Sequence, residues 1–292
     1  MKRLFKYLLL ICIIIVLCFI LNIYKKNDIV VLSIKTYNND ILYKEGNGFV
    51  YKIDDYAYIL TNYHVISESD SIYVYYNDYK IKANILNYDE YDDIAIITID
   101  KKYINKKMKI SNFNFNDKVR IVTNNLSVDG YVLSDINAVK INYLNKSKML
   151  DLIKINSNIK EGYSGSPVIN RDNMVIGIMT MVDTDNGDSY AIPIDVNKIN
   201  DLESGNLYRA NLGIKATTSL DIKGVLLSEV YDNKCASKGN LISGDIIVSI
   251  NDIKINDVLE FRYYLYKYKI GDIVKIKYYR DGNYYDTFLT LE

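Results

Sequence analysis

The chain is 292 residues long, which is enough for about two or three domains of roughly 100 to 200 residues each. Apolar residues make up 49 % of it and charged residues 25 %, and its 36 basic side chains balance its 36 acidic ones. A nucleic-acid-binding protein is typically strongly basic, and this chain is not. We therefore expect a globular protein that does not bind nucleic acid.

An apolar segment opens the chain. Residues 8–21 form an unbroken apolar run that follows the basic side chains Lys2, Arg3 and Lys6. With its extension to Tyr24 the run matches the roughly 17 to 25 residues of a transmembrane helix, and no small-x-small cleavage site follows it. We therefore expect residues 1–28 to form a cytoplasmic N-terminus and a single-pass anchor in the cell membrane, with the rest on the extracytoplasmic side. A removed signal peptide or a lipidated one is the alternative.

The cysteines exclude an internal disulfide in the exported part. Two of the three lie in the apolar segment, so Cys235 has no partner there. Because no histidine lies near Cys235 in the sequence, we expect a small apolar core residue rather than a reactive thiol.

Short apolar or alternating runs follow one another from residue 29 to about 192, at the spacing of strands in barrels and sandwiches. Asn, Asp, Gly and Ser fill the segments between them, as in turns. No helical periodicity is sustained before residues 194–205. The sequence therefore predicts a mostly β domain over residues 29–204.

The only histidine of the chain, His64, lies in YILTNYHVI, where a strand pattern ends and a turn or short helix could begin. Taken alone, such a histidine is more often a hydrogen-bonded structural residue than a catalyst. Asp92 and Asp93 lie further on, at the start of the apolar run DDIAII. A carboxylate there could accept the imidazole N–H, although an acid in that position is also typical of a strand start or a turn.

Ser164 lies in EGYSGSPVIN, where Gly162 and Gly165 allow a tight turn. Such a turn lets the N–H groups of Gly162 and Ser164 converge on one point as an oxyanion hole. A serine nucleophile also needs a base, and His64 is the one base of the usual kind in the chain. We therefore predict a catalytic triad of His64, Asp93 and Ser164, in that chain order.

Two other kinds of site are excluded. An α/β-hydrolase has G-x-S-x-G at its nucleophile and places the serine before the histidine, whereas here the histidine comes first and position 166 is serine. One histidine and scattered acids give no zinc-binding spacing, and the acid-rich residues 183–189 lack the length and terminal Glu of a calcium loop. We expect a surface turn there, and no metal or organic cofactor.

Two helices are predicted beyond the β region. Residues 194–205 carry apolar residues at roughly helical spacing and end at a glycine. After a linker, the run DVLEFRYYLYKY places Val258, Phe261 and Leu265 on one face, with Asp257 as its N-terminal cap. Strand-like runs surround this helix, so residues 205–292 form a second, smaller domain.

Residues 29 to about 204 resemble the trypsin-like protease domain of the HtrA (Deg) family. The segments that carry the match, in chain order, are GNGFV at 46–50, ILTNYHVI at 59–66, DDIAII at 92–97, IKINSNIKEGYSGSPVIN at 153–170, VIGIMT at 175–180 and YAIPI at 190–194. The order of runs after residue 205, with GDIIVSINDIKI, resembles a PDZ domain of the same type. The resemblance implies a chymotrypsin-like double β-barrel, each barrel six-stranded, with the site in the cleft between them, followed by the PDZ domain.

The resemblance also implies roles for two further segments. Residues of the first would wall the specificity pocket and favour small or medium apolar substrate side chains; they are Ile178, Met179 and Thr180. Residues of the second would form a carboxylate-binding loop beside which a peptide adds as a strand; they are Asn211, Leu212, Gly213 and Ile214. The alternative for the second segment is that it only closes the PDZ sheet.

The chain departs from the family pattern without losing a catalytic atom. Tyr163 replaces the usual Asn, Ser166 the usual Gly, Tyr63 an Asn or Ala, and Asn156 an Asp. The SGSP form also resembles staphylococcal glutamyl endopeptidases, but those use a second histidine that this chain lacks.

The function implied by the resemblance is a membrane-anchored serine endopeptidase that cleaves unfolded or damaged exported proteins and binds C-terminal peptides at its PDZ domain. Many members form homotrimers. Two alternatives stay open. One is a catalytically silent peptide-binding or chaperone-like module, whose oxyanion hole is blocked by Tyr163 or by an inactive resting loop. The other is a regulatory protease with one signalling substrate.

Overall fold

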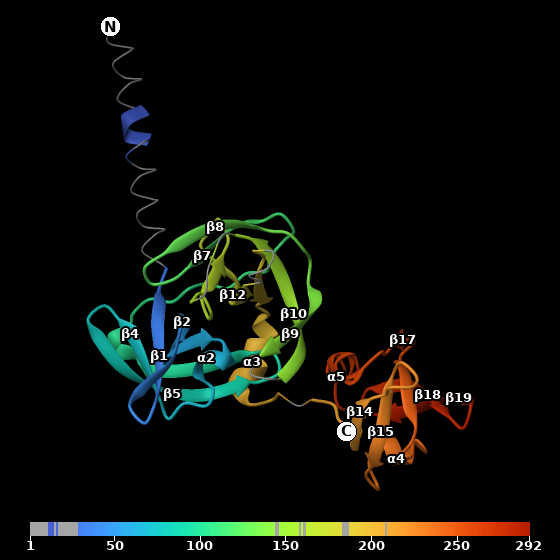
Figure 1. Ribbon diagram of the computed structural model, residues 1–292. Coiled ribbons are helices and arrows are strands. Elements are labelled where there is room, and N and C mark those ends of the chain that lie inside the picture. Colours follow the sequence, from blue (N-terminus) through green and yellow to red (C-terminus); the bar gives the residue numbers. More distant parts are fainter. Residues whose placement is uncertain are drawn as a thin grey trace. The chain divides into compact units, whose positions relative to one another are not determined.

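The computed structural model describes residues 11–14, 16, 29–143, 146–157, 159, 162–182, 187–207 and 209–292 (Figure 1). Most of the predicted membrane anchor, residues 1–28, and part of the predicted surface turn at 183–189 lie outside these residues. Among the residues described, no helix is long and apolar enough to cross a membrane. The chain separates into two compact units, one built mainly of residues 29–137 and 151–206 and the other of residues 138–150 and 207–292.

The first unit begins with a closed barrel of six antiparallel strands in the order β1-β2-β3-β6-β5-β4. The strands are β1 (Val31–Asn38), β2 (Ile41–Ile53), β3 (Tyr56–Thr61), β4 (Ser71–Tyr76), β5 (Tyr79–Asp89) and β6 (Ile94–Asp100). Leu32, Ile59 and Ile97 are fully buried and belong to its core. Helix α2 (Tyr63–Ile66) follows β3 directly, and the short 3-10 helix η1 (Lys101–Tyr103) follows β6.

The second barrel contains seven strands in the order β13-β12-β11-β7-β8-β10-β9, and a further pairing of β13 with β10 closes six of them into a ring. The strands are β7 (Lys118–Val122), β8 (Ser127–Val132), β9 (Asn137–Tyr143), β10 (Lys146–Asn156), β11 (Pro167–Ile169), β12 (Val175–Val182) and β13 (Ser189–Pro193). Two barrels were expected, and β9 adds one strand to the expected six by pairing outside the ring.

Helix α3 (Val196–Ser204) follows the second barrel, as predicted. The Asp195 side chain caps its start by accepting from the Asn197 N–H, and Gly205 ends it in the left-handed conformation at φ 72°. Its Glu203 carboxylate accepts hydrogen bonds from the Tyr51 hydroxyl and the Lys52 ammonium, so the helix is tied to strand β2 of the first barrel.

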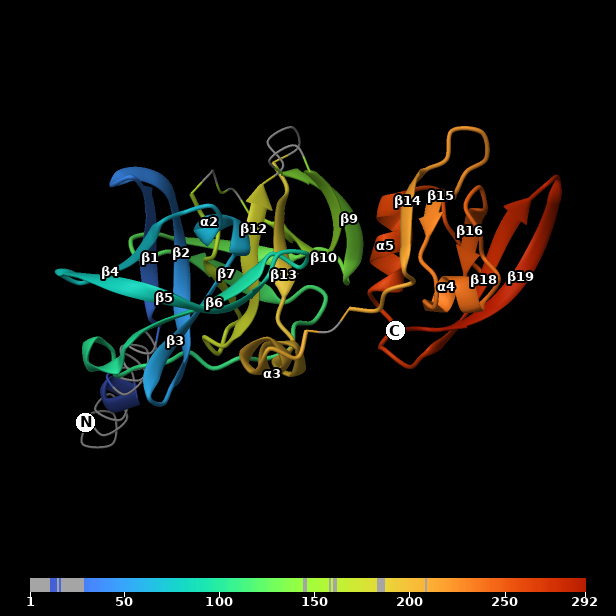
Figure 2. The ribbon, with the colours of Figure 1, turned by 90° about the horizontal axis from the view of Figure 1, so that it is seen from below.

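The second unit has a six-stranded sheet in the order β14-β15-β16-β18-β19, with β17 paired to β16 (Figure 2). Its elements are β14 (Ile214–Thr218), β15 (Val225–Val230), α4 (Cys235–Lys238), β16 (Ile246–Ile250), β17 (Ile253–Lys254), α5 (Val258–Leu265), β18 (Ile273–Arg280) and β19 (Asn283–Thr290). The predicted mostly β class is confirmed in both units.

Helix α5 and Cys235 confirm two local predictions in this unit. Asp257 caps α5 by accepting from the N–H groups of two residues in its first turn, and Phe261 and Leu265 are buried in the core. Cys235 is buried in the same core, where burial raises the pKa of its thiol. The cysteine is therefore a packed core residue with little thiolate at neutral pH.

Candidate active site

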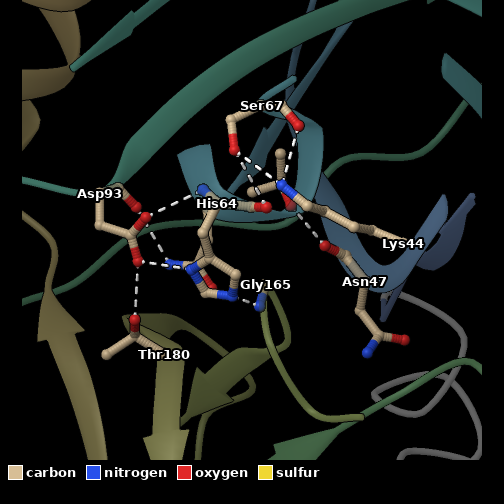
Figure 3. Close-up of polar contacts among 9 residues, drawn as sticks. Lys44, Asn47, His64, Ser67, Asp93, Gly165 and Thr180 are labelled. Atoms are coloured by element: carbon tan, nitrogen blue, oxygen red, sulfur yellow. Dashed lines mark hydrogen bonds and ion pairs between the residues drawn. The ribbon is translucent and has the colours of Figure 1, made fainter. Parts of the chain in front are cut away.

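The imidazole of His64 and the carboxylate of Asp93 contact each other directly (Figure 3). His64 Nδ1 lies 2.8 Å from Asp93 Oδ2, and the His64 backbone N–H donates to Asp93 Oδ1 at 3.0 Å. The short helix α2 makes this double contact possible, because it begins directly after strand β3 and turns both donors of one residue toward the same carboxylate. Asp93 itself adopts a left-handed conformation, φ 57°, just before β6. The pairing can hold the ring in the tautomer with Nδ1 protonated.

Asp93 is buried and receives hydrogen bonds from both barrels. The Thr180 hydroxyl, on β12 of the second barrel, donates to Asp93 Oδ2 at 2.8 Å. Asn62 donates from its side-chain amide to the Asp93 carbonyl at 3.1 Å. The neighbouring Asp92 is used differently, since its carboxylate lies 2.5 Å from the Lys198 ammonium on α3. Of the two adjacent acids, Asp93 is thus the one that bonds to the imidazole of His64.

Ser164 precedes β11, in a loop that the first barrel holds by its backbone. The Asn47 N–H on β2 donates to the Ser164 carbonyl at 2.8 Å. The Asn62 side-chain oxygen accepts from the Gly165 N–H at 2.7 Å. Asn62 occupies the N-cap position of α2, two residues before the histidine. The same amide side chain therefore links the loop of Ser164 to the segment that carries His64.

Two glycines in left-handed conformations shape this loop, with φ 96° at Gly162 and 79° at Gly165. A Cβ at Gly165 would lie 1.9 Å from the Asn47 carbonyl oxygen, so only glycine fits there. The Asn47 side-chain amide donates to the Gly162 carbonyl at 2.9 Å. No acceptor of the Gly162 or Ser164 N–H lies among the described residues.

Two departures from the family pattern are accommodated inside the second barrel. Tyr163 is half-buried and packs against the core that contains Val168 and Met179. Ser166 is fully buried, and its hydroxyl has no hydrogen-bond partner among the described residues. A buried hydroxyl without a partner costs free energy, about 1 to 3 kcal/mol, that a glycine at this position would avoid.

The three residues predicted to wall the specificity pocket lie on β12 and are all buried. Ile178 is fully buried, and Met179 belongs to the core of the second barrel. Thr180 bonds to Asp93, as described above. A role of these residues in substrate selection stays a prediction, and the hydroxyl of Thr180 has a second use that the sequence did not indicate.

The loop predicted to bind a peptide carboxylate, residues 211–214, leads into β14. Gly213 has φ 71°, and a Cβ there would lie 2.2 Å from the Lys234 Cβ. Its N–H donates to the Asn211 side-chain oxygen at 2.6 Å, and Leu212 is buried in the core of this unit. Ile214 opens the strand. Peptide binding by this loop stays a prediction.

The sequence analysis did not assign the observed roles of three groups at this site, which are Asn47, Asn62 and the Thr180 hydroxyl. Asn47 and Asn62 lie in segments that carry the family resemblance, GNGFV and ILTNYHVI, so position in those segments was the available signal. Their contacts join residues about 90 to 115 positions apart, which no local pattern encodes. No group of three or more metal-ligating side chains occurs within the described part of the chain.

Comparison with known proteins places these features in a family. Residues 46–178 match the family model of the trypsin-like peptidase domain, and residues 191–291 match that of the PDZ domain. The serine protease Do-like HtrA of Lactococcus lactis subsp. lactis is 29 % identical over 283 residues, covering 82 % of this chain and 69 % of that protein. A serine protease HtrA-like protein of Staphylococcus epidermidis is 30 % identical over 279 residues, covering 81 % and 47 % respectively.

Solved structures show the same fold. The serine endoprotease from Yersinia pestis matches 89 % of this chain and 93 % of its own, with a TM-score of 0.64 and 21 % identity. The combination of both domain matches, the curated relatives and this structural likeness shows that the chain belongs to the HtrA family of serine endopeptidases, with a trypsin-like peptidase domain and a PDZ domain.

Proposed function

We propose that His64, Asp93 and Ser164 form the catalytic triad of this endopeptidase, with the N–H groups of Gly162 and Ser164 as its oxyanion hole. The observation that carries the proposal is the direct His64–Asp93 contact beside a loop that Asn47 and Asn62 hold against the same barrel. The left-handed conformations of Gly162 and Gly165 add support.

In this mechanism the chain's own groups carry every proton transfer. His64 Nε2 takes the proton of the Ser164 hydroxyl while Ser164 Oγ attacks the carbonyl carbon of the scissile peptide bond. The carbonyl oxygen becomes an oxyanion that the Gly162 and Ser164 N–H groups stabilise. The imidazolium, held by Asp93, then protonates the leaving amine. Water, activated by His64, releases the acyl group from Ser164.

For the substrate we propose unfolded or damaged exported proteins, with C-terminal peptides bound at the PDZ domain by residues 211–214. Helix α5 lies beside β14, since the Val258 N–H donates to the Thr218 hydroxyl at 3.2 Å, and an added strand along β14 would face this helix. The HtrA-type protease AlgW has been solved with a tripeptide and with a decapeptide, which supports the proposal of peptide binding by this chain.

The proposed organisation is a membrane anchor over residues 1–28, a protease domain over 29–204 and a PDZ domain over 205–292, with both domains on the extracytoplasmic side. The apolar run at 8–21 and its basic flank support the anchor. A relative from Pseudomonas savastanoi is named a probable periplasmic serine endoprotease, which agrees with an exported site of action. A homotrimer is the proposed assembly, by family resemblance.

Degradation of an unfolded protein tests this function. The full chain, purified in detergent, is incubated with β-casein alongside Ser164→Ala and the control Ser204→Ala, whose hydroxyl lies on α3 outside the site. We expect cleavage by wild type and by the control, and a loss of about 10⁴-fold or more in Ser164→Ala. Undiminished cleavage by a folded Ser164→Ala protein would refute the assignment. A folded wild type that binds C-terminal peptides without cleaving casein would instead favour the catalytically silent module.

A further inference from the structure

Lys44 of strand β2 contacts the end of the helix that carries His64. Its ammonium donates to the Ser67 carbonyl at 2.8 Å and to the Ser67 hydroxyl at 2.9 Å (Figure 3). Lys44 is half-buried and Ser67 is buried, so these bonds are shielded from bulk water. Burial lowers the pKa of Lys44, while the nearby carboxylates of Glu68 and Asp93 act in the opposite direction. The chain thus keeps a cation in a place where burial disfavours its charge.

Ser67 passes this contact on to the backbone of the histidine. It is the C-cap residue of α2, and its N–H donates to the Tyr63 carbonyl at 2.9 Å. Its hydroxyl donates to the His64 carbonyl at 3.3 Å. Because a hydroxyl carries one hydrogen and two lone pairs, it can donate to His64 while it accepts from Lys44. The bonds therefore run from the ammonium through the hydroxyl to the His64 carbonyl.

Helix α2 needs such support because it has only four residues. A helix this short is unstable by itself, and the carbonyls at its end lack partners within the helix. A cation near a helix C-terminus is also electrostatically favourable. The helix is held at its N-terminal side by Asn62 and through the ring of His64 by Asp93. The Lys44 ammonium supplies a separate attachment at the opposite end.

The same strand also holds the loop of Ser164. Asn47 lies three residues after Lys44 on β2 and donates from its N–H to the Ser164 carbonyl. Between them, Gly46 passes so close to the helix that a Cβ would lie 2.7 Å from a Val65 methyl and 3.1 Å from the Ser164 carbonyl oxygen. Strand β2 is therefore a common support for the helix of the histidine and the loop of the serine.

We propose that Lys44 is a positioning residue: it anchors the C-terminal end of α2 through Ser67 and so fixes the imidazole of His64 relative to Ser164. This inference rests on the triad of the proposed function. Lys44 does not touch the reacting atoms. Its effect is on the geometry in which His64 takes the proton of Ser164, so its loss slows acylation without weakening substrate binding.

The test uses the full chain and a fluorophosphonate probe, which acylation-competent serines attack. The maximal labelling rate and the half-saturating probe concentration are measured for wild type, Lys44→Met, Lys44→Arg and Ser67→Ala. We expect Lys44→Met to lower the maximal rate about 10- to 100-fold, the scale for a catalytic group displaced by up to about 1 Å, with an unchanged half-saturating concentration. Lys44→Arg, which keeps the charge and the donors, restores most of the rate, and Ser67→Ala has an intermediate effect.

The single histidine of the chain permits a second readout that needs no activity. With isotope-labelled histidine, the imidazole of His64 is the only such NMR signal in the protein. Lys44→Met is expected to shift or broaden it, while Lys44→Arg leaves it close to wild type. The matched control is Lys35→Met on β1, because the Lys35 ammonium pairs with the exposed Glu45 carboxylate and has no contact with α2 among its hydrogen bonds.

The outcomes separate this inference from the proposed function. A Lys44→Met protein with the wild-type labelling rate and an unchanged imidazole signal would overturn the role of Lys44. The role would also be overturned if Lys44→Met and Lys35→Met lost the same fraction of the labelling rate, because the loss would then not depend on a contact with helix α2. Absence of labelling at Ser164 in wild type would refute the triad itself, while the NMR comparison would still decide whether Lys44 positions His64. Should Lys44→Met not fold, Lys44→Arg and Ser67→Ala carry the same test.

Discussion

The first barrel contributes to the candidate site mainly through side chains, whereas the second contributes mainly through the conformation of a loop. His64 and Asp93, both from the first barrel, contact each other by their side chains, and the Asn62 side-chain amide donates to the Asp93 carbonyl. The loop of Ser164 instead depends on Gly162 and Gly165, and the first barrel holds it by its carbonyl and N–H groups. A substitution in the first half of the site therefore removes a side-chain contact, whereas a substitution at Gly165 disturbs the backbone on which the loop of Ser164 depends.

The largest effect, on the free energy of unfolding, is expected from a methyl group added at Gly165, and Gly162 serves as the comparison. Gly165→Ala would place a Cβ 1.9 Å from the Asn47 carbonyl oxygen in addition to straining a left-handed backbone, so we expect a loss of at least about 3 kcal/mol in the free energy of unfolding. Gly162→Ala meets no atom within 4 Å and should cost only the backbone strain, about 1 to 2 kcal/mol. Denaturant unfolding of both variants measures the difference, and equal losses would contradict this account of the loop.

A smaller effect, on the rate of acylation, is expected when the hydrogen bond from the Asn47 side chain to the loop of Ser164 is removed. Asn47→Asp keeps the shape of the side chain but replaces the donor that bonds to the Gly162 carbonyl with an oxygen that repels it. We expect acylation to slow about 10- to 100-fold, because the proposed oxyanion donors move with the loop.

The matched control for this change is Asn38→Asp. The Asn38 amide also donates to a backbone carbonyl, that of Glu68 at 2.8 Å, but in an exposed position. Its labelling rate with the fluorophosphonate probe should stay near that of wild type. If both variants lost the same activity, the contact of Asn47 with the loop would have no special part in catalysis.

The smallest effect is expected at Thr180, the second-barrel side chain that reaches the first-barrel carboxylate. Thr180→Val keeps the volume but removes one hydrogen bond to Asp93, which is worth about 1.5 to 3 kcal/mol for a charged acceptor. We expect a fall of about tenfold in the labelling rate, and Thr180→Ser, which keeps the hydroxyl, should retain most of it. A Thr180→Val protein as active as wild type would show that the remaining donors suffice to hold Asp93.

Local signals explain which parts of the fold could be predicted from the sequence. Helices α3 and α5 were predictable because Asp195 and Asp257 cap their starts and Gly205 ends α3 within a few residues of sequence. Strand β8 carries no such local signal, because Asp129 and Gly130 make a pair typical of a turn. The glycine is required there by packing instead, since a Cβ would lie 2.6 Å from the Asn156 carbonyl oxygen of β10.

The candidate site, too, combines features that have a local signal in the sequence with features that depend on distant contacts. A triad of His64, Asp93 and Ser164 could be proposed from the sequence because the residue types and their chain order limit the chemistry. The choice between Asp92 and Asp93 as the partner of His64 is visible in the structure, where Asp92 pairs with Lys198. The support that Lys44 gives to α2 could not be predicted, because it joins two segments that each appear ordinary in sequence.

The measurement that tests the central claim most directly is the identification of the residue that a fluorophosphonate probe modifies in the full chain. Mass spectrometry of the labelled wild-type protein locates the modified residue, and His64→Ala serves as the comparison. The triad predicts modification of Ser164 in wild type and its loss in His64→Ala, with both proteins folded. Modification of another serine, or equal labelling of Ser164 in His64→Ala, would contradict the coupling of base and nucleophile on which the account rests.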